Sequence, residues 1–348
     1  MKNKSVKKLL LVGSQTIHTY NYLELVQDYF DDILLITDHR REGYTYRTVE
    51  CDFSLSLKNI RSTVKEIRRQ ILDFQPSVIH IHQANSFAFY TLLANKSLNI
   101  PTILTAWGSD ILLNPRRNIL LKAMTRFNLI KADFLTSDSV YMAEEMKKLV
   151  PSLHEILIAN FGIGIDPIPV EKENIIYSNR LHKKLYRIDK IIAAFHAFQQ
   201  NNKEWKLVIA ATGEETENLK KQVSELGIEH KVEFAGWVDK VQNQQYYSLS
   251  KIWVSIPESD ATSISLLEAM ISRCIPVVSD LPANHEWIED NKNGVIATNV
   301  EEDFIQRALL IDYNKAVEIN VQRIEKDGTK EANKGKFLKL YQSIISND

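Results

Sequence analysis

The stretch Ser255-Ile-Pro-Glu-Ser-Asp260-Ala-Thr-Ser263-Ile-Ser-Leu-Leu-Glu268-Ala-Met270 joins the end of an apolar run to a segment with helical periodicity. Residues 251–256 have the composition of a buried strand, and the apolar residues after Ser263 recur at the i, i+3, i+7 spacing of a helix that packs on a sheet. Thr262 or Ser263 can serve as the N-cap of that helix. A helix start presents unpaired N–H groups and a positive dipole end, which together favour an anion.

Two carboxylates bracket this helix start, Asp260 in the turn and Glu268 on the second helical turn. At a rise of about 1.5 Å per residue, Glu268 lies roughly 8–10 Å beyond the start of the helix. This is close to the span of a diphosphate between two sugars, so a nucleotide-sugar could place its ribose near Glu268 and its transferred sugar near Asp260. The alternative is an ordinary capped helix with two solvated acids.

Length and composition indicate a globular protein of two domains. The chain has 348 residues, of which 44% are hydrophobic and 25% are charged, and single cores stop growing near roughly 250–300 residues. The net charge of −1 gives no global signature of nucleic-acid binding. Cys51 and Cys274 show no metal-ligand spacing and are expected to be reduced, buried thiols of a cytoplasmic protein. No run approaches the roughly 20 apolar residues of a membrane span, so any contact with the inner membrane would be peripheral, at its cytoplasmic face.

Short apolar runs alternate with helix-like segments along most of the chain, and the pattern restarts after the Gly- and Pro-rich segment 160–169. This alternation predicts two Rossmann-like, doubly wound α/β domains with parallel sheets. The expected domains are 1–165 and 166–330, followed by a C-terminal helix at 331–348 that packs back on the first domain. Strands are expected at 9–12, 33–36, 78–81, 102–105, 134–136, 156–159, 175–178, 206–211, 232–235, 252–256, 276–279 and 294–297. Because ligands bind at the carboxyl ends of such strands, the site is expected in a central cleft that the two domains face.

A basic cluster follows the first strand of the second domain. Arg180 stands at the end of that strand, and Lys183, Lys184 and Arg187 come soon after it. Such a cluster suits a diphosphate, although a solvated basic loop would have the same composition. Gly213 lies in the next βα turn, where the chain is expected to approach another group closely.

The first domain offers weaker signals. Gly13 follows the first strand, but the remaining glycines of a dinucleotide fingerprint are missing, which disfavours a dehydrogenase. His80 and His82 lie on one face of a strand without a Cys or carboxylate partner at ligand spacing, so we expect no metal site. His82, at the carboxyl end of the strand, is expected to line the cleft, and His80 is expected to be structural. The chain contains no Asp-x-Asp, the usual means of holding a divalent cation against a diphosphate.

The segment from Asn114 to Phe127 has the pattern of a basic amphipathic helix. It could lie on an anionic membrane surface. The alternative is an ordinary packed helix with a basic outer face.

Several motifs resemble the retaining glycosyltransferases of the GT-B fold, family 4 (glycosyl transferases group 1). The specific ones are Asp260-(seven residues)-Glu268-Ala-Met, Ile275-Pro-Val-Val-Ser, Asn284-His-Glu286-Trp-Ile and Asn293-Gly294. Weaker matches are Ala235-Gly-Trp237, Asn160–Asp166 and Thr105-Ala-Trp107-Gly108-Ser-Asp110. The resemblance extends over nearly the whole chain and is most specific in residues 255–294.

The resemblance implies a hexosyltransferase that moves a hexose or N-acetylhexosamine from a nucleotide-diphosphate sugar to a saccharide or lipid-linked acceptor in bacterial surface polysaccharide assembly. Glu268 would hold the ribose hydroxyls, and the catalytic residues would be Asp260, beside the transferred sugar, and Arg180, on the phosphate. Retention would follow from front-face attack assisted by the leaving phosphate, without a metal or other cofactor. The implied donor-binding residues are Glu268, Arg180, Arg187, Lys184, Gly213, Ala261, Thr262, Ser263 and Ile264. The acceptor or cleft residues are Gly13, Ser14, His82, Trp107, Gly108 and Asp110.

The chain departs from the family pattern at three places. The first acid is Asp260 instead of Glu, which shortens its reach. The lysine that accompanies Arg180 falls near Tyr186, so Arg187 or Lys184 must replace it or the phosphate charge is less well neutralised. Trp107 replaces a histidine.

Two other functions remain open on the same scaffold, a nucleotide-sugar epimerase and a non-catalytic nucleotide-sugar-binding protein. A retaining hydrolase is disfavoured, because its two carboxylates should lie about 5 Å apart.

Overall fold

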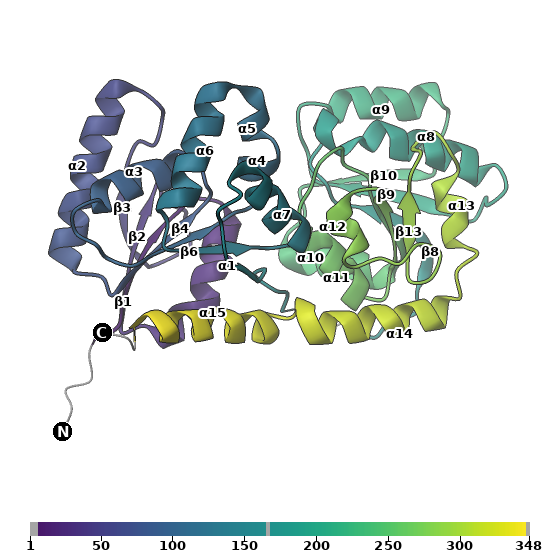
Figure 1. The fold of residues 1–348 in the computed structure, drawn as a ribbon. Coiled ribbons are helices and arrows are strands. Elements are labelled where there is room, and N and C mark those ends of the chain that lie inside the picture. Colours follow the sequence, from purple (N-terminus) through teal and green to yellow (C-terminus); the bar gives the residue numbers. More distant parts are fainter. Residues whose placement is uncertain (1–5, 165–167, 346–348) are drawn as a thin grey trace. The chain divides into compact units, whose positions relative to one another are not determined.

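The computed structural model of the protein describes residues 6–164 and 168–345 (Figure 1). The chain divides into two compact units, unit 1 with Met1–Phe161 and Lys330–Asp348, and unit 2 with Gly162–Thr329. The domain boundary expected at 165/166 lies outside the described residues, as does part of the 160–169 linker. The C-terminal helix α15, Lys330–Ile345, belongs to unit 1.

Unit 1 contains a seven-stranded parallel sheet with the strand order β3-β2-β1-β4-β5-β6-β7. Its strands are β1 Lys8–Val12, β2 Asp32–Thr37, β3 Arg47–Glu50, β4 Val78–His82, β5 Thr102–Thr105, β6 Phe134–Ser137 and β7 Ile156–Ile158. The strands expected in this region are confirmed, but β3 was not predicted. β3 is a short, partly exposed edge strand with the sequence Arg-Thr-Val-Glu, so it lacks the continuous apolar run that marks a central strand.

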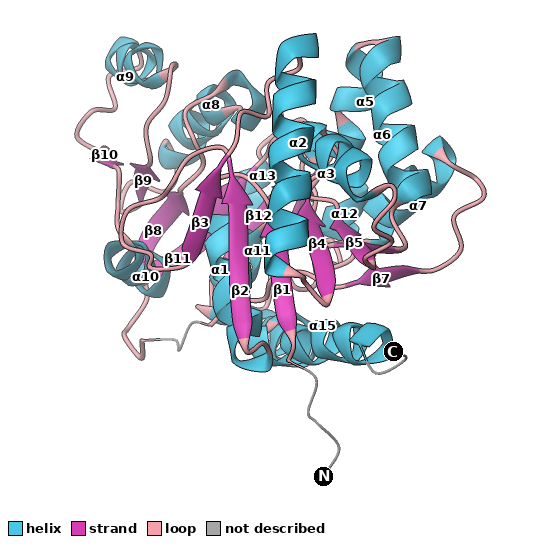
Figure 2. Cartoon of the chain, turned by 90° about the vertical axis from the view of Figure 1, so that its left-hand side faces the viewer, coloured by secondary structure: helices cyan, strands magenta, loops and turns pink. Residues whose placement is uncertain are grey.

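Helices cover both faces of this sheet (Figure 2). They are α1 Ile17–Val26, α2 Leu57–Phe74, α3 Ser86–Asn95, α4 Ser109–Leu112, α5 Asn114–Arg117, α6 Ile119–Lys131, α7 Val140–Leu149 and α15. α1 and α15 share one apolar core with β1, in which Tyr22 and Tyr341 are fully buried. α2 packs on α3, and α3 packs on α6. The helix expected over 114–127 is divided at Asn118, whose backbone is extended and whose side chain caps α6.

Unit 2 contains a six-stranded parallel sheet with the order β10-β9-β8-β11-β12-β13. Its strands are β8 Glu173–Ser178, β9 Lys206–Ala210, β10 Val232–Gly236, β11 Ser250–Ser255, β12 Ile275–Ser279 and β13 Val295–Ala297. Its helices are α8 Ile188–Gln199, α9 Thr216–Glu225, α10 Lys240–Leu249, α11 Ile264–Ile271, α12 Pro282–His285, α13 Phe304–Ala308 and α14 Tyr313–Arg323. α8, α9 and α13 bury their apolar side chains in one core of the sheet, whereas α10 and α11 bury theirs in the other.

Each sheet has a point where the strand order reverses. In unit 1 this point lies between β1 and β4, and in unit 2 it lies between β8 and β11. The loops that leave the carboxyl ends of two such strands diverge to opposite faces, and open α/β sheets bind ligands in the resulting crevice. The predicted residues Gly13 and His82 lie at the first point, while Arg180 and the 260–264 turn follow the strands that meet at the second.

The C-terminal helix is held to unit 1 by a buried hydrogen-bonded cluster as well as by apolar contacts. The Tyr341 hydroxyl lies 2.6 Å from His80 Nδ1 and 2.7 Å from the Tyr22 hydroxyl. His80 Nε2 lies 2.6 Å from Thr105 Oγ1. These bonds support the structural role expected of His80. None of the helices in residues 6–164 and 168–345 combines the length and the apolar composition that a bilayer crossing requires.

Candidate functional site

The reversal point of unit 2 brings together Arg180, Asp260 and Ser263. Arg180 Nη2 donates a hydrogen bond to Asp260 Oδ2 at 2.8 Å, and Nη1 donates to Ser263 Oγ at 2.5 Å. Ser263 occupies the N-cap position of α11 but makes no side-chain cap bond; its hydroxyl accepts from Arg180. The start of α11 therefore carries a guanidinium group in addition to the positive end of its own dipole.

Arg180 is held in place from a second side by Tyr186. Its guanidinium carbon lies 4.5 Å from the centre of the Tyr186 ring, and only 12% of its side chain is exposed. Burial alone would lower the pKa of Arg180, but the neighbouring Asp260 and Tyr186 raise it above its ordinary value. Tyr186, which stands near the expected lysine position, thus supports Arg180 by ring stacking and adds no positive charge.

The other two basic candidates differ in their surroundings. Arg187, which has φ +50° at the start of α8, donates from Nε to the Ile256 carbonyl at 2.7 Å and from Nη2 to the Pro257 carbonyl at 2.8 Å. Its guanidinium therefore joins the loop after β8 to the segment that follows β11. Lys184 lies in the 3₁₀ turn Lys184–Tyr186 with an exposed side chain, and it is the more accessible of the two cations.

Glu268 lies half-buried on α11. Burial raises the pKa of its carboxyl from 4.5 to about 7, although the Tyr247 hydroxyl, the charge of Lys240 and the Asn243 side chain act in the opposite direction. In this structure the carboxyl is consequently close to half-ionised at neutral pH.

A polar network beside Glu268 was not found from the sequence. The Tyr177 hydroxyl and Asn179 Nδ2 both donate to Asn243 Oδ1, at 2.7 and 3.0 Å. Asn179 Nδ2 also lies 2.8 Å from the Tyr247 hydroxyl, and Asn179 Oδ1 accepts from Trp253 Nε1 at 3.0 Å. These side chains come from β8 and the residue after it, from α10 and from β11, so the sequence carries no local signal that they meet.

Gly213 and the turn before α11 are tightly enclosed. A Cβ atom on Gly213 would lie 2.5 Å from the His182 carbonyl oxygen. The group that the chain approaches closely at this glycine is therefore the loop after β8. Ala261, Thr262 and Ser263 are buried, Ile264 is half-buried, and the Ala261 N–H donates to Asp260 Oδ1 at 3.1 Å.

In unit 1 the chain runs close to the ends of β1 and β4. A Cβ on Gly13 would lie 3.0 Å from Thr19 Oγ1 and 3.2 Å from His82 Cβ, so glycine permits this tight βα turn. Ser14, the next residue, is buried, and its hydroxyl lies 3.3 Å from Thr16 Oγ1.

His82 is fully buried, and neither of its ring nitrogens has a hydrogen-bond partner among the described residues. Burial, followed by the nearby His80 and His18, keeps the pKa of His82 well below its ordinary value. Its ring centre lies 5.1 Å from that of Trp107 and 5.6 Å from that of Phe161. His82 is therefore a neutral imidazole within an aromatic cluster.

The loop after β5 is anchored by Asp110. The buried Asp110 carboxylate accepts from the Ala84 N–H at 2.6 Å and from the Trp107 N–H at 3.0 Å. Burial raises its pKa, and these two hydrogen bonds oppose the rise. Gly108 has φ +118°, a conformation that strongly favours glycine. The Asp110 carboxylate thus joins the loops after β4 and β5. Together with the Gly108 turn it fixes the backbone of Trp107, whose side chain is half-buried.

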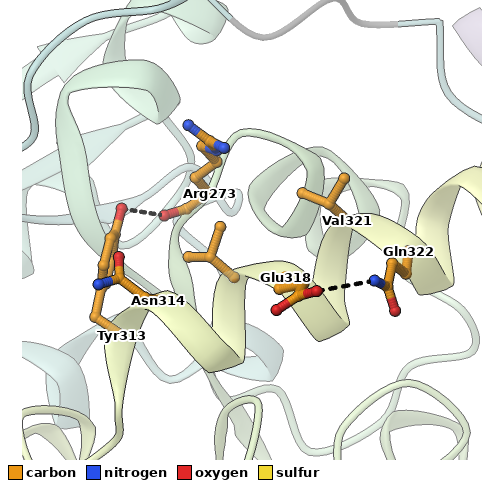
Figure 3. A pocket seen from close by; sticks show the side chains of 7 residues that line it. Arg273, Tyr313, Asn314, Glu318, Val321 and Gln322 are labelled. Atoms are coloured by element: carbon orange, nitrogen blue, oxygen red, sulfur yellow. Dashed lines mark hydrogen bonds between the residues drawn. The ribbon is translucent and has the colours of Figure 1, made fainter.

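A separate hollow of about 330 Å³ lies on unit 2 between the end of α11 and α14 (Figure 3). Its wall includes Arg273, Tyr313, Glu318 and Gln322, and the Tyr313 hydroxyl donates to the Arg273 carbonyl at 3.0 Å. None of the residues predicted for the site lines this hollow.

The chain has two parallel Rossmann-like sheets. In unit 2 a guanidinium–carboxylate pair lies at the start of α11, beside the point where the strand order reverses. These features define a protein of the GT-B class. Family models agree with this assignment. The model described as "Glycosyl transferase 4-like" matches residues 7–139, and the one described as "Glycosyl transferases group 1" matches residues 163–318. The chain belongs to the group 1, family 4-like glycosyltransferases.

Individual relatives are distant in sequence. An uncharacterized glycosyltransferase of Haemophilus influenzae is 25% identical over 262 residues, which are 72% of this chain and 69% of that protein. The GDP-mannose:cellobiosyl-diphosphopolyprenol alpha-mannosyltransferase of Xanthomonas oryzae pv. oryzae is 20% identical over 240 residues, 66% of this chain and 62% of that protein.

Solved structures show the same fold. HepE of Anabaena, in complex with UDP and glucose, superposes with a TM-score of 0.79 at 12% identity over 97% of this chain and 100% of that chain. A glycosyltransferase of Rickettsia africae superposes with a TM-score of 0.80 at 15% identity over 99% of this chain and 100% of that chain.

Proposed function

We propose that the protein is a retaining hexosyltransferase that transfers a hexose or N-acetylhexosamine from a nucleotide-diphosphate sugar to a saccharide or lipid-linked acceptor. Its setting would be bacterial surface polysaccharide assembly at the cytoplasmic side of the membrane. The observation that carries the proposal is the placement of Arg180, bonded to Asp260 and Ser263, at the start of α11. The same helix carries Glu268 one and a half turns or so further on, as the span of a nucleotide-sugar requires.

In this arrangement the donor diphosphate lies across the start of α11. A phosphate oxygen competes with Asp260 for the guanidinium of Arg180, which has enough N–H donors to keep its bond to Ser263. The exchange frees the Asp260 carboxylate to accept a hydroxyl of the transferred sugar. Glu268 then accepts the hydroxyls of the ribose.

The transfer itself breaks the bond between the anomeric carbon and the phosphate oxygen and forms the bond to the acceptor oxygen on the same face. The acceptor proton passes to the departing phosphate oxygen. Arg180 and the dipole of α11 stabilise the negative charge that develops on the diphosphate. We propose that these groups act without a metal ion, since the sequence lacks Asp-x-Asp.

The relatives support a nucleotide-sugar donor. HepE has been solved with UDP-glucose, with UDP, and with UDP and glucose. The mannosyltransferase from Xanthomonas oryzae is named for a GDP-mannose donor and an acceptor linked to diphosphopolyprenol, which supports a lipid-linked acceptor here.

The test is incubation with a panel of UDP-, GDP- and dTDP-sugars, with and without EDTA, followed by chromatography of nucleotides and sugars. We expect slow release of free nucleotide from one donor class, unaffected by EDTA and lost in Asp260→Asn. Asp189→Asn, at an exposed aspartate on α8, is the matched control and should retain the activity. Tight binding without turnover would instead identify a non-catalytic binding protein, and an altered sugar still attached to its nucleotide would identify an epimerase.

The pKa of Glu268 gives a second test. A carboxyl with a pKa of about 7 is only about 3% ionised at pH 5.5. If only the ionised carboxylate accepts both ribose hydroxyls, the apparent Kd of the donor at pH 5.5 is about 30-fold higher than at pH 8.5. Isothermal titration with an intact nucleotide-sugar, whose diphosphate does not titrate in this range, measures the change. Glu268→Gln should bind more weakly at pH 8.5 and show no such slope. A wild-type Kd that does not vary with pH would refute the role of Glu268.

A further inference from the structure

The outer face of α6 in unit 1 is apolar where a helix usually carries charge. Ile119 and Leu120 are 76% and 78% exposed at its first turn, and Ile130 is 53% exposed at its last. The buried side chains Thr125, Asn128 and Leu129 lie on the opposite side of the helix, at 100° per residue. The core of unit 1 therefore accounts for one face of α6, and the exposed isoleucines form a second apolar stripe.

Basic side chains border this stripe. From Asn114 to Ala132 the chain carries five cations and no acid, namely Arg116, Arg117, Lys122, Arg126 and Lys131. The protein as a whole has a net charge of −1, so this is a strong local concentration of positive charge.

Only some of these cations form an ion pair or a hydrogen bond with the described residues of unit 1. Arg116 pairs with Glu145 at 3.0 Å, and Arg126 Nη1 donates to the Leu149 carbonyl at 2.6 Å. Lys122 and Lys131 have no ion pair with any residue that the structure describes. Lys122, Arg126 and Lys131 line the same shallow groove as Ile119 and Ile130, so charge and apolar surface face the same way.

We propose that α6 is a membrane-docking helix that lies flat on an anionic lipid bilayer. Ile119, Leu120 and Ile130 insert between the headgroups, while Lys122 and Lys131 contact lipid phosphates. An interfacial helix requires this combination of an apolar stripe with flanking cations. A second copy of the chain would place like charges against each other, and a nucleic acid would leave the isoleucines in water. The inference rests on unit 1 alone and does not depend on the proposed transfer reaction.

Flotation with lipid vesicles tests the proposal. We expect the protein to bind vesicles of phosphatidylcholine that contain about one third phosphatidylglycerol, and to bind pure phosphatidylcholine much more weakly. Since each basic residue near an anionic surface contributes about 1 kcal/mol, Lys122→Gln with Lys131→Gln should reduce partitioning about 30-fold. Ile119→Ser with Leu120→Ser should reduce it at least about tenfold, because the inserted apolar area is lost.

The matched control is Leu57→Ser with Lys65→Gln on α2, where Leu57 is 84% exposed and Lys65 is exposed. This variant should float like the wild type, and all variants should keep the wild-type thermal transition and donor turnover without vesicles. Equal binding to neutral and anionic vesicles, or an equal loss in the control, would overturn the proposal. A dimer that only the α6 variants dissociate would overturn it as well, by showing that a second copy covers this face.

Discussion

The Glu268→Gln substitution replaces a half-buried carboxyl on α11 with an amide of nearly the same shape, and its effect on stability should depend on pH. The folded-state pKa of about 7 lies above the ordinary value of 4.5, so between these values the folded protein keeps a proton that the unfolded chain has released. Stability from this group is therefore present below pH 4.5 and is lost as the pH rises through 7. At about 1.4 kcal/mol per pKa unit, the free energy of unfolding falls by about 3 kcal/mol between pH 4.5 and pH 8.

Urea unfolding at several pH values, followed by tryptophan fluorescence, measures this effect. Four of the five tryptophans lie in unit 2, so the signal reports mainly on the unit that contains Glu268. Glu268→Gln should abolish most of the decline with pH and be relatively more stable than the wild type at pH 8. Glu318→Gln, on α14 beside Gln322 (Figure 3), is the control and should retain the wild-type slope. Parallel curves for Glu268→Gln and the wild type would refute the burial argument.

Three further outcomes follow from the geometry. Asp260→Asn should reduce turnover of the nucleotide-sugar by at least about 100-fold with little change in donor KM, because Asp260 acts on the transferred sugar; an unchanged kcat would exclude that role. Gly213→Ala would bring a Cβ to 2.5 Å from the His182 carbonyl oxygen, and overpacking of this kind should lower stability by about 1–3 kcal/mol in thermal melts. Tyr341→Phe removes the buried hydroxyl bonded to His80 and should destabilise unit 1 by about 1–2 kcal/mol, which hydrogen exchange in α15 would report, whereas unchanged protection there would contradict the argument.

The sequence was sufficient for the architecture because strands buried on both faces need continuous apolar runs. It missed β3, whose edge position leaves Arg47 and Glu50 exposed and removes that requirement. It also placed Arg180 at the end of its strand and Asp260 in the turn after its strand, which are local features of the chain. Since all strands of a parallel sheet end at the same edge, both residues were already expected at the carboxyl edge of the sheet.

Only the tertiary structure decided which strand ends are neighbours and what surrounds each side chain. β8 and β11 are adjacent although about 70 residues separate them, and this adjacency, seen in the paired registers, lets Arg180 reach Asp260. The network beside Glu268 joins side chains from the end of β8, from α10 and from β11 that no spacing in the sequence connects. The sequence by itself determined that a carboxylate follows the start of α11. The packing around that carboxylate raises its pKa to about 7, because burial disfavours the charged form.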